Sequence, residues 1–325
     1  MEARTKNSVI KDLTEGPLAR QIVLFALPIM GANLLQALYT MVDLWVVGQF
    51  ASSAAISAVS VAGQIVFLSH SIGIGLGNGG QVLISQQVGA REYDRLNRAI
   101  GTLFSVCMIA SVAVTVLAAA FSGLWLELMN TPAEALSEAG SYLLICCIGI
   151  PFVYGGGTLC AILRGLGDSR RPMYILGVST GVNIVLDVLF VAGFHWGAAG
   201  AAWATSIAQV VTFVYALLHL YRHRAEVGFD FRPASFKIDV PLMKVSLRLG
   251  APLVVMNATI TLSMMVVVSL VNVYGVAASA VMGIGSKLTS LVNVVTQSTQ
   301  TAASSVVAQN FAAGKMDRVR RTVWI

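Results

Sequence analysis

The chain has 325 residues, of which 56% are hydrophobic and only 11% are charged, and its mean hydropathy is +0.78. Soluble domains carry about 25% charged residues, so this composition excludes a soluble globular protein and predicts that lipid surrounds most of the chain. The net charge of +6 does not indicate nucleic-acid binding, because the basic residues lack interleaved aromatic side chains.

The basic residues are gathered in short clusters separated by long apolar stretches. All but one of the 21 lysines and arginines lie within residues 4–20, 91–98, 164–171, 222–248 and 315–321. Each intervening stretch has room for two membrane crossings, and the connections at the far side carry no Lys or Arg. Because basic loops are retained in the cytoplasm, the pattern predicts a multi-pass protein of the cell membrane with a cytoplasmic N-terminus.

The apolar stretches predict an all-α membrane protein with eight complete spans. Each span reaches the roughly 20 residues that a bilayer core requires. In chain order the predicted spans are residues 22–48, 54–86, 100–126, 142–163, 172–194, 197–221, 249–274 and 276–307.

The chain also repeats itself in parallel orientation. Pro28 near the start of the first span matches Pro252 in the seventh, and Asp94 after the second span matches Asp317 after the eighth. This offset predicts two six-helix lobes, as in transporters built from two parallel repeats. We expect a first lobe at 1–221, a cytoplasmic linker at 222–248, and at 249–325 an incomplete second lobe with two full helices and the start of a third. The chain would then be the N-terminal portion of such a protein.

Two acidic residues lie within apolar spans at a similar predicted depth. Asp43 and Asp187 are expected roughly 8 and 12 Å inside the far-side ends of their helices, from the rise per residue. Asn183 shares a helix face with Asp187, and Thr205 is expected level with it on the next, antiparallel helix. The four residues predict an all-oxygen pocket for a hard cation such as Na⁺ or for protons, and the residues leave both possibilities open.

Other intramembrane polar residues predict a wet central cavity. Lys287 is the one basic residue outside the clusters, and we expect it either to face this cavity or to tie helices together. Asn33 and Gln36 add polar groups to the first span. Pro28 and Pro252 lie within their spans and are expected to bend them.

The chain resembles the multidrug and toxic compound extrusion (MATE) family in several segments taken together. These are Ala-Leu-Pro-Ile-Met (26–30), Gln-Ala-Leu-Tyr-Thr-Met-Val-Asp (36–43), Val-Leu-Ile-Ser-Gln-Gln-Val-Gly-Ala (82–90), Leu-Arg-Gly-Leu-Gly-Asp-Ser (163–169) and Asn-Ile-Val-Leu-Asp (183–187). The resemblance implies twelve helices in two lobes that form an outward-facing V. It also implies export of amphipathic, often cationic, compounds in exchange for Na⁺ or H⁺, without a cofactor. We expect a monomer whose partners are small molecules and the lipid bilayer.

The resemblance also assigns roles to individual residues. The family's first-helix acid falls on Asp43, its fifth-helix pair on Asn183 and Asp187, and a sixth-helix threonine on Thr205. Tyr39 and Pro28 match first-helix positions linked to the cation site and to helix bending, and Lys287 matches a basic residue common in the eighth helix. Val267 stands near where Asp43 would repeat, so we expect the coupling site in the first lobe.

Two other functions remain open at this point. A flippase for lipid-linked saccharides belongs to the same superfamily, but it would be expected to have a strongly basic cavity. A non-transporting fragment of such a transporter is the second alternative. An enzyme is not expected, because no nucleophile–base pair or metal-binding motif is apparent in the sequence.

Overall fold

The computed structural model describes the backbone of residues 9–129, 131–272 and 276–324. It describes their side chains too, except those of Leu44, Ser53 and a set in the α9–α10 region that includes residues 276–288. The described residues form helices and connecting segments and no strand, which confirms the predicted all-α class.

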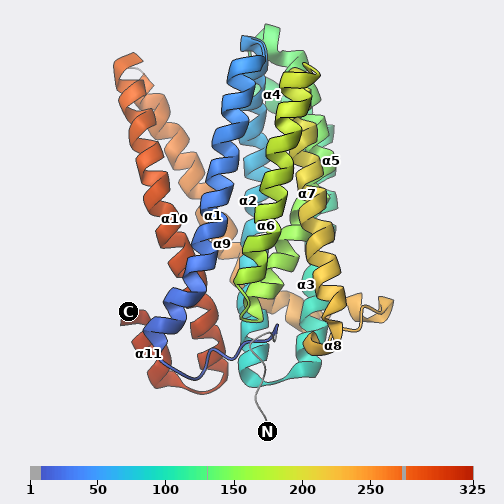
Figure 1. Cartoon of the computed structure of the whole chain (residues 1–325), viewed down its shortest axis with the longest axis vertical. Helices are drawn as coiled ribbons and strands as arrows, with labels where there is room; N and C mark the ends of the chain where they lie inside the picture. Colours follow the sequence, from blue (N-terminus) through green and yellow to red (C-terminus); the bar gives the residue numbers. More distant parts are fainter. Residues whose placement is uncertain (1–8, 130, 273–275, 325) are drawn as a thin grey trace.

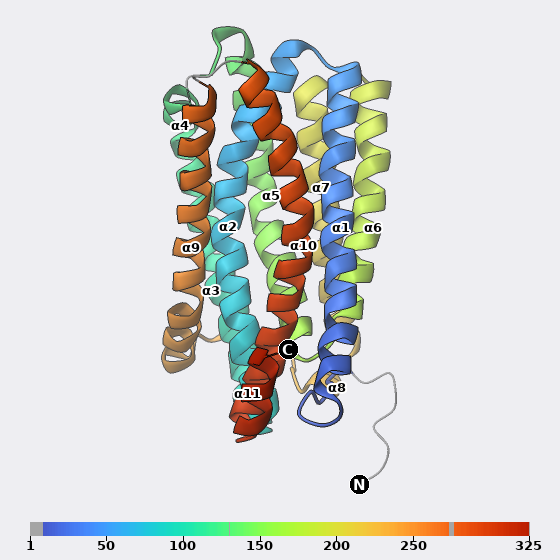
Figure 2. The same ribbon diagram turned by 90° about the vertical axis from the view of Figure 1, so that its left-hand side faces the viewer.

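Six helices form a bundle around α5 (Figures 1 and 2). They are α1 (Leu18–Phe50), α2 (Ser53–Ala90), α3 (Tyr93–Ala120), α5 (Ala133–Gly165), α6 (Arg170–Asp187) and α7 (Gly197–Arg222). All six are long and apolar enough to cross a membrane, with the π-helical turn Val188–Gly193 extending α6, so the first six predicted spans are confirmed. Helix α5 packs against α2, α3 and α7.

We call the two ends of the bundle the base and the distal end. The base holds the α2–α3 and α5–α6 loops and both described ends of the chain (Figure 1). One apolar core lies toward the distal end and includes Val46, Tyr142 and Val191; a second lies toward the base and includes Leu83, Leu163 and Phe229.

Several helix bounds differ from the predicted ones. The third predicted span ended at residue 126, but α3 stops at Ala120 and a separate short helix, α4 (Ser122–Leu128), follows. Helix α9 (Val240–Asn272) begins nine residues before the predicted start at 249, because its first turns extend beyond the apolar stretch. The predicted linker is therefore shorter, and it contains α8 (Arg224–Val227) and a 3-10 turn, Pro233–Phe236. The predicted bounds follow the apolar stretches, whereas the helices continue into the polar residues beside them, so the helix ends differ from the span ends.

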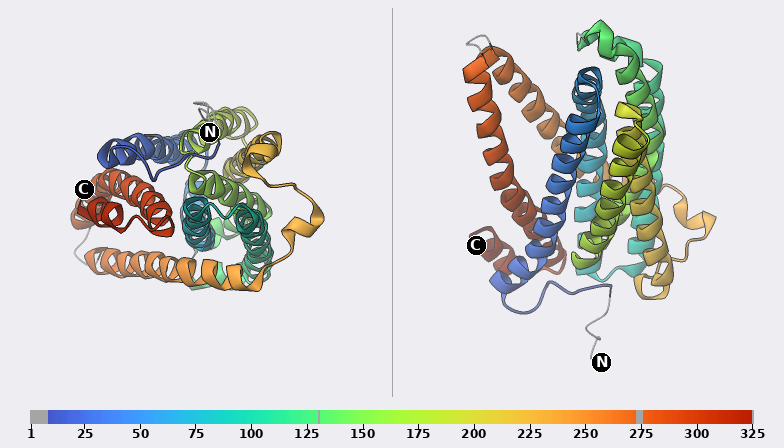
Figure 3. Two further views of the ribbon diagram at one scale, coloured as in Figure 1. Left: turned by 90° about the horizontal axis from the view of Figure 1, so that it is seen from below. Right: turned by 45° about the horizontal axis from the view of Figure 1, so that its top comes forward.

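Helices α9 and α10 (Val276–Ala312) carry the seventh and eighth predicted spans, and the short helix α11 (Met316–Trp324) follows α10. Toward the distal end, α9 and α10 diverge from the six-helix bundle, and Figure 3 shows the resulting V. Toward the base they pack on α2, and α10 also packs on α1.

Glycines on α2 allow this close approach. A Cβ atom built on Gly79 would lie 2.5 Å from the backbone nitrogen of Gly250, and one on Gly75 would lie 2.4 Å from Val254 Cγ2. The contact with the Gly250 backbone cannot be relieved by a side-chain rotation, so α2 and α9 would have to separate to admit a side chain at residue 79.

We predict that Gly79→Ala lowers the stability of the detergent-purified protein by about 1–3 kcal/mol, the usual cost of overpacking. The matched control is Gly63→Ala on the same helix, where a Cβ meets no atom within 4 Å. Thermal unfolding measures both variants. Equal melting temperatures for the two would contradict the close α2–α9 contact.

Candidate functional site

The two intramembrane acids lie inside the six-helix bundle, toward its distal end. Asp43 is on α1 and is 8% exposed, and Asp187 is the last residue of α6 and is fully buried. Asp43 and Asp187 come from different helices, yet they lie close enough for their charges to repel each other.

A chain of hydrogen bonds connects the other predicted site residues. Tyr39, one turn before Asp43, shares a hydrogen bond of 2.9 Å with the Thr205 hydroxyl on α7. With the amide of Asn183 oriented to suit its neighbours, its nitrogen donates to Asp187 Oδ2 at 2.9 Å and its oxygen accepts from the Thr205 backbone N–H at 3.3 Å. Four of the five predicted residues are thus directly linked across α1, α6 and α7.

One oxygen of each carboxylate lacks a hydrogen-bond donor. Asp43 Oδ1 and Asp187 Oδ1 are both buried, and neither accepts a hydrogen bond from the described residues. An anionic oxygen buried without a partner is costly, so such a pair favours binding a cation or a proton. The surrounding hydroxyl, amide and carboxylate oxygens are ligands that suit a hard cation.

Two features near this site had not been predicted. Tyr142 on α5 is buried and lies close to both Asp43 and Tyr39. Tyr142 lies three spans after Asp43 and Tyr39 in the sequence, at the start of an apolar stretch, and gave no signal there. The π-helical turn Val188–Gly193 begins directly after Asp187, and such turns occur frequently at functional sites.

The predicted cavity residues have different surroundings. Gln36 is exposed on α1, and the Asn33 side chain donates a 3.0 Å hydrogen bond to the Ser298 hydroxyl of α10. Lys287 lies on α10, but its side chain is outside the described residues. Pro28 and Pro252 both lie within continuous helices, α1 and α9.

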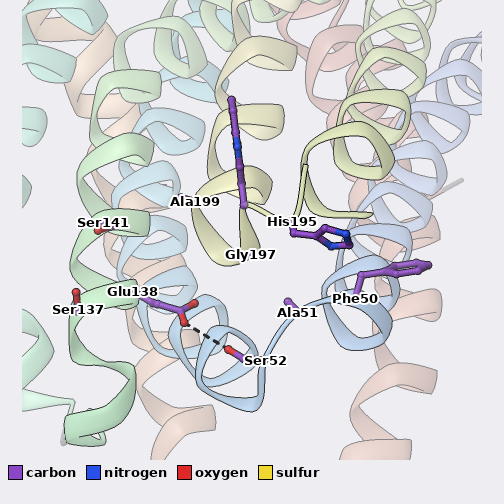
Figure 4. A pocket seen from close by; sticks show the side chains of 10 residues that line it. Phe50, Ala51, Ser52, Ser137, Glu138, Ser141, His195, Gly197 and Ala199 are labelled. Carbon is purple, nitrogen blue, oxygen red and sulfur yellow. Dashed lines mark hydrogen bonds between the residues drawn. The ribbon is translucent and has the colours of Figure 1, made fainter. Parts of the chain in front are cut away.

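A separate hollow of about 320 Å³ lies at the distal end (Figure 4). It lies between the α1–α2 connection, the start of α5 and the turn before α7, and its lining includes Phe50, Glu138 and His195. Ser52 caps α2 and donates to Glu138 at 3.4 Å, as Figure 4 shows. The Glu138 carboxylate accepts the hydrogen bond from Ser52 beside the N-terminus of α2, and this contact accounts for it as a structural link between α5 and α2. Glu138 is not one of the predicted site residues.

Comparison with known proteins decides the family. The MatE profile matches residues 28–189 and 252–325, which is more than half of the chain. The chain belongs to the MatE family. It is similar to the probable multidrug resistance protein YoeA of Bacillus subtilis, with 31% identity over 99% of this chain and 71% of that protein. It is also similar to the probable multidrug resistance protein YpnP of the same organism, with 32% identity over 95% of this chain and 68% of YpnP.

The fold of this MatE protein also matches solved structures. One is the outward-facing conformation of a multidrug resistance MATE family transporter of the MOP superfamily, with a TM-score of 0.89 and 24% identity over 98% of this chain and 70% of that one. At this identity the match establishes the fold. The resemblance in the sequence is therefore confirmed, and the chain is a multi-pass membrane protein of a transporter family.

Proposed function

We propose that this MatE protein exports amphipathic, often cationic, small molecules across the cell membrane in exchange for Na⁺ or H⁺. The observation that carries the proposal is the pair of buried carboxylates, each with one oxygen that accepts no hydrogen bond from the described residues. The names of the similar Bacillus subtilis proteins, which describe multidrug resistance, support the substrate class.

The geometry suggests how a cation would act. Tyr39 and Asp43 belong to α1, whereas Asn183, Asp187 and Thr205 belong to α6 and α7. A cation or proton bound between the carboxylates removes their mutual repulsion and holds α1 against α6 and α7. Loss of the cation weakens that contact, and Pro28 provides a point at which α1 can bend, because proline interrupts the helical hydrogen bonds.

The substrate would bind between the bundle and α9–α10. Our candidates for lining residues are Gln36, Asn33 and Lys287. A lysine at this place would compete electrostatically with a cationic substrate. Asn33 donates a hydrogen bond to Ser298 on α10, so this contact would change if α10 moved relative to the six-helix bundle. Pro252 is the corresponding candidate for bending in α9.

The arrangement of basic residues supports a cytoplasmic base. The clusters around Arg91, Arg171, Arg222 and Lys315 lie at the ends of helices that meet at the base (Figure 1). The connections at the distal end carry no Lys or Arg. The positive-inside rule therefore favours a base in the cytoplasm and a V that opens to the outside.

We predict that Asp43→Asn and Asp187→Asn each abolish export of a fluorescent organic cation from energised cells, because a neutral amide cannot exchange a cation or proton. Both variants should reach the membrane in normal amounts, since the amide matches the shape of the carboxylic acid. The control is Asp94→Asn, which changes an exposed carboxylate at the base. Undiminished gradient-driven export in both site variants would reject the coupling site.

The topology gives a second prediction. In intact cells, a membrane-impermeant maleimide should label Ser52→Cys at the distal end and should not label Ser235→Cys in the segment before α9. Ser235 should become reactive only after the cells are opened. Labelling of residue 235 from outside would contradict the cytoplasmic base.

A further inference from the structure

The N-terminal segment (residues 9–17) crosses the base between the six-helix bundle and helices α10 and α11. We propose that this segment is a clamp that holds α10 against the bundle while the V is open, and that α10 separates from it in each transport cycle. The inference rests on the proposed transport function.

On one side, the segment is built into the bundle. Val9 is fully buried and Ile10 nearly so, within the core that also contains Leu166 and Phe229. The Lys11 backbone N–H donates to the Leu166 carbonyl at 2.8 Å, and the Lys11 ammonium pairs with Asp168 at 3.2 Å.

The α5–α6 loop is shaped to receive it. Gly167 has φ +91°, and a Cβ there would lie 2.6 Å from the Lys11 carbonyl oxygen, so this position requires glycine. Apolar burial, a backbone hydrogen bond and a loop that fits the segment closely together attach it to the bundle.

On the other side, polar side chains of α10 hold the segment. Gln309 Oε1 accepts from the Leu13 N–H at 2.9 Å, and its Nε2 donates to the Lys11 carbonyl at 3.4 Å. Asn310 Nδ2 donates to the Leu13 carbonyl at 3.1 Å. Both amide side chains are fully buried, so removing either would leave unpaired main-chain groups of the segment inside the protein.

The loop and helix after α10 extend this contact. Lys315 Nζ donates to the Thr14 carbonyl at 3.0 Å, and Arg318 donates to the Gly16 carbonyl at 2.9 Å. Leu13 also packs on Val306, which adds one apolar contact. Most of the links to α10 and α11 are thus side-chain hydrogen bonds that water can replace once the helices part.

A tight turn keeps the two attachments at a fixed spacing. Asp12 Oδ1 accepts hydrogen bonds from the Thr14 N–H at 2.8 Å and from its hydroxyl at 2.7 Å. Burial alone would raise the pKa of Asp12, but these bonds and the charges of Arg91 and Lys315 outweigh it and lower the pKa. The carboxylate therefore stays ionised at neutral pH and holds the turn.

The two attachments differ in their chemistry, and this difference decides which one breaks when α10 moves. The bundle side depends on buried apolar side chains, whereas the α10 side depends mainly on polar ones. Beneath the segment, α10 also touches α2 so closely that a Cβ on Gly89 would lie 2.1 Å from the Gln309 carbonyl oxygen. Opening the base therefore breaks the α10 contacts and leaves the segment with the bundle.

The first test measures exposure of the base without requiring transport. Ser305 is fully buried between α10 and α2, where its hydroxyl accepts from Gln81 Nε2 at 2.8 Å. In inside-out vesicles, we expect Asn310→Leu to raise the rate of maleimide labelling of Ser305→Cys about tenfold, because it removes the clamp hydrogen bond to Leu13. The control is Thr299→Leu, an exposed position on the same helix. An unchanged labelling rate in Asn310→Leu would overturn the proposal.

The second test uses cross-links and covers the case in which Asn310→Leu fails to fold. In a background with Cys107, Cys146, Cys147 and Cys160 replaced by alanine, the pair Leu13→Cys/Val306→Cys should block export when oxidised and restore it when reduced. The matched pair Lys11→Cys/Leu166→Cys, which joins the segment to the bundle, should leave export within about twofold.

The outcomes separate the two proposals. Normal export with the Leu13–Val306 cross-link formed, or loss of export with the Lys11–Leu166 cross-link alone, would overturn the clamp. Absence of export from both reduced proteins would count against the proposed transport function instead, while the labelling test would still decide the clamp.

Discussion

Two carboxylates buried in an apolar bundle, on different helices but near enough for their charges to repel each other, set the main physical constraint on this protein. Removing a charged group from water is expensive, and placing a second negative charge beside it adds repulsion. The structure gives Asp187 one hydrogen bond, from Asn183, and leaves an oxygen of each acid without a donor among the described residues. The two acids are therefore least costly to bury when a cation or protons neutralise them, and the proposed exchange function would use this dependence. In the proposed mechanism, the same neutralisation holds together or loosens the helices that carry the acids and their partners, α1, α6 and α7.

Helix α1 connects this constraint to the rest of the molecule. Its distal part carries Asp43 and Tyr39, and its middle part contacts α10 through the Asn33–Ser298 hydrogen bond and the packing of Phe25 and Ile29 on Ala302. Its base continues directly into the N-terminal segment, which binds the end of α10. One continuous stretch of chain thus links the proposed cation site to both contacts with α10. In the proposed transport cycle, a change in the position of α1 at the site would be transmitted along a helix that also contacts α10.

Much of this architecture follows from the sequence, because a lipid bilayer requires long apolar helices and makes charged residues within them costly. Apolar length and basic clusters located the six spans of the bundle, and the cost of intramembrane acids singled out Asp43 and Asp187. The i, i+4 spacing predicted that Asn183 lies beside Asp187, and the antiparallel packing of the next helix predicted that Thr205 lies level with it. The hydrogen bonds of Asn183 to both residues agree with these two predictions. The remaining features depend on tertiary packing. Tyr142 approaches the site from α5 because of how the helices pack, and the π-helical turn after Asp187 was not predicted from the sequence. The N-terminal segment is short and mixes apolar and polar residues without a helical or strand period, so only its contacts with Leu166, Gln309 and Asn310 reveal its place.

The coupling role of Asp43 and Asp187 is tested most directly by whether ions stabilise the protein through these two acids. The measurement is thermal unfolding of the purified chain, with and without Na⁺, in mildly acidic and mildly alkaline buffer, for the wild type and for Asp43→Asn/Asp187→Asn. A ligand that binds only the folded state raises the melting temperature, so Na⁺ at alkaline pH, or protons at acidic pH, should stabilise the wild type. The double variant is neutral at both positions and should lose that dependence. A double variant that keeps the wild-type response to Na⁺ and pH would contradict the claim that these carboxylates form the coupling site.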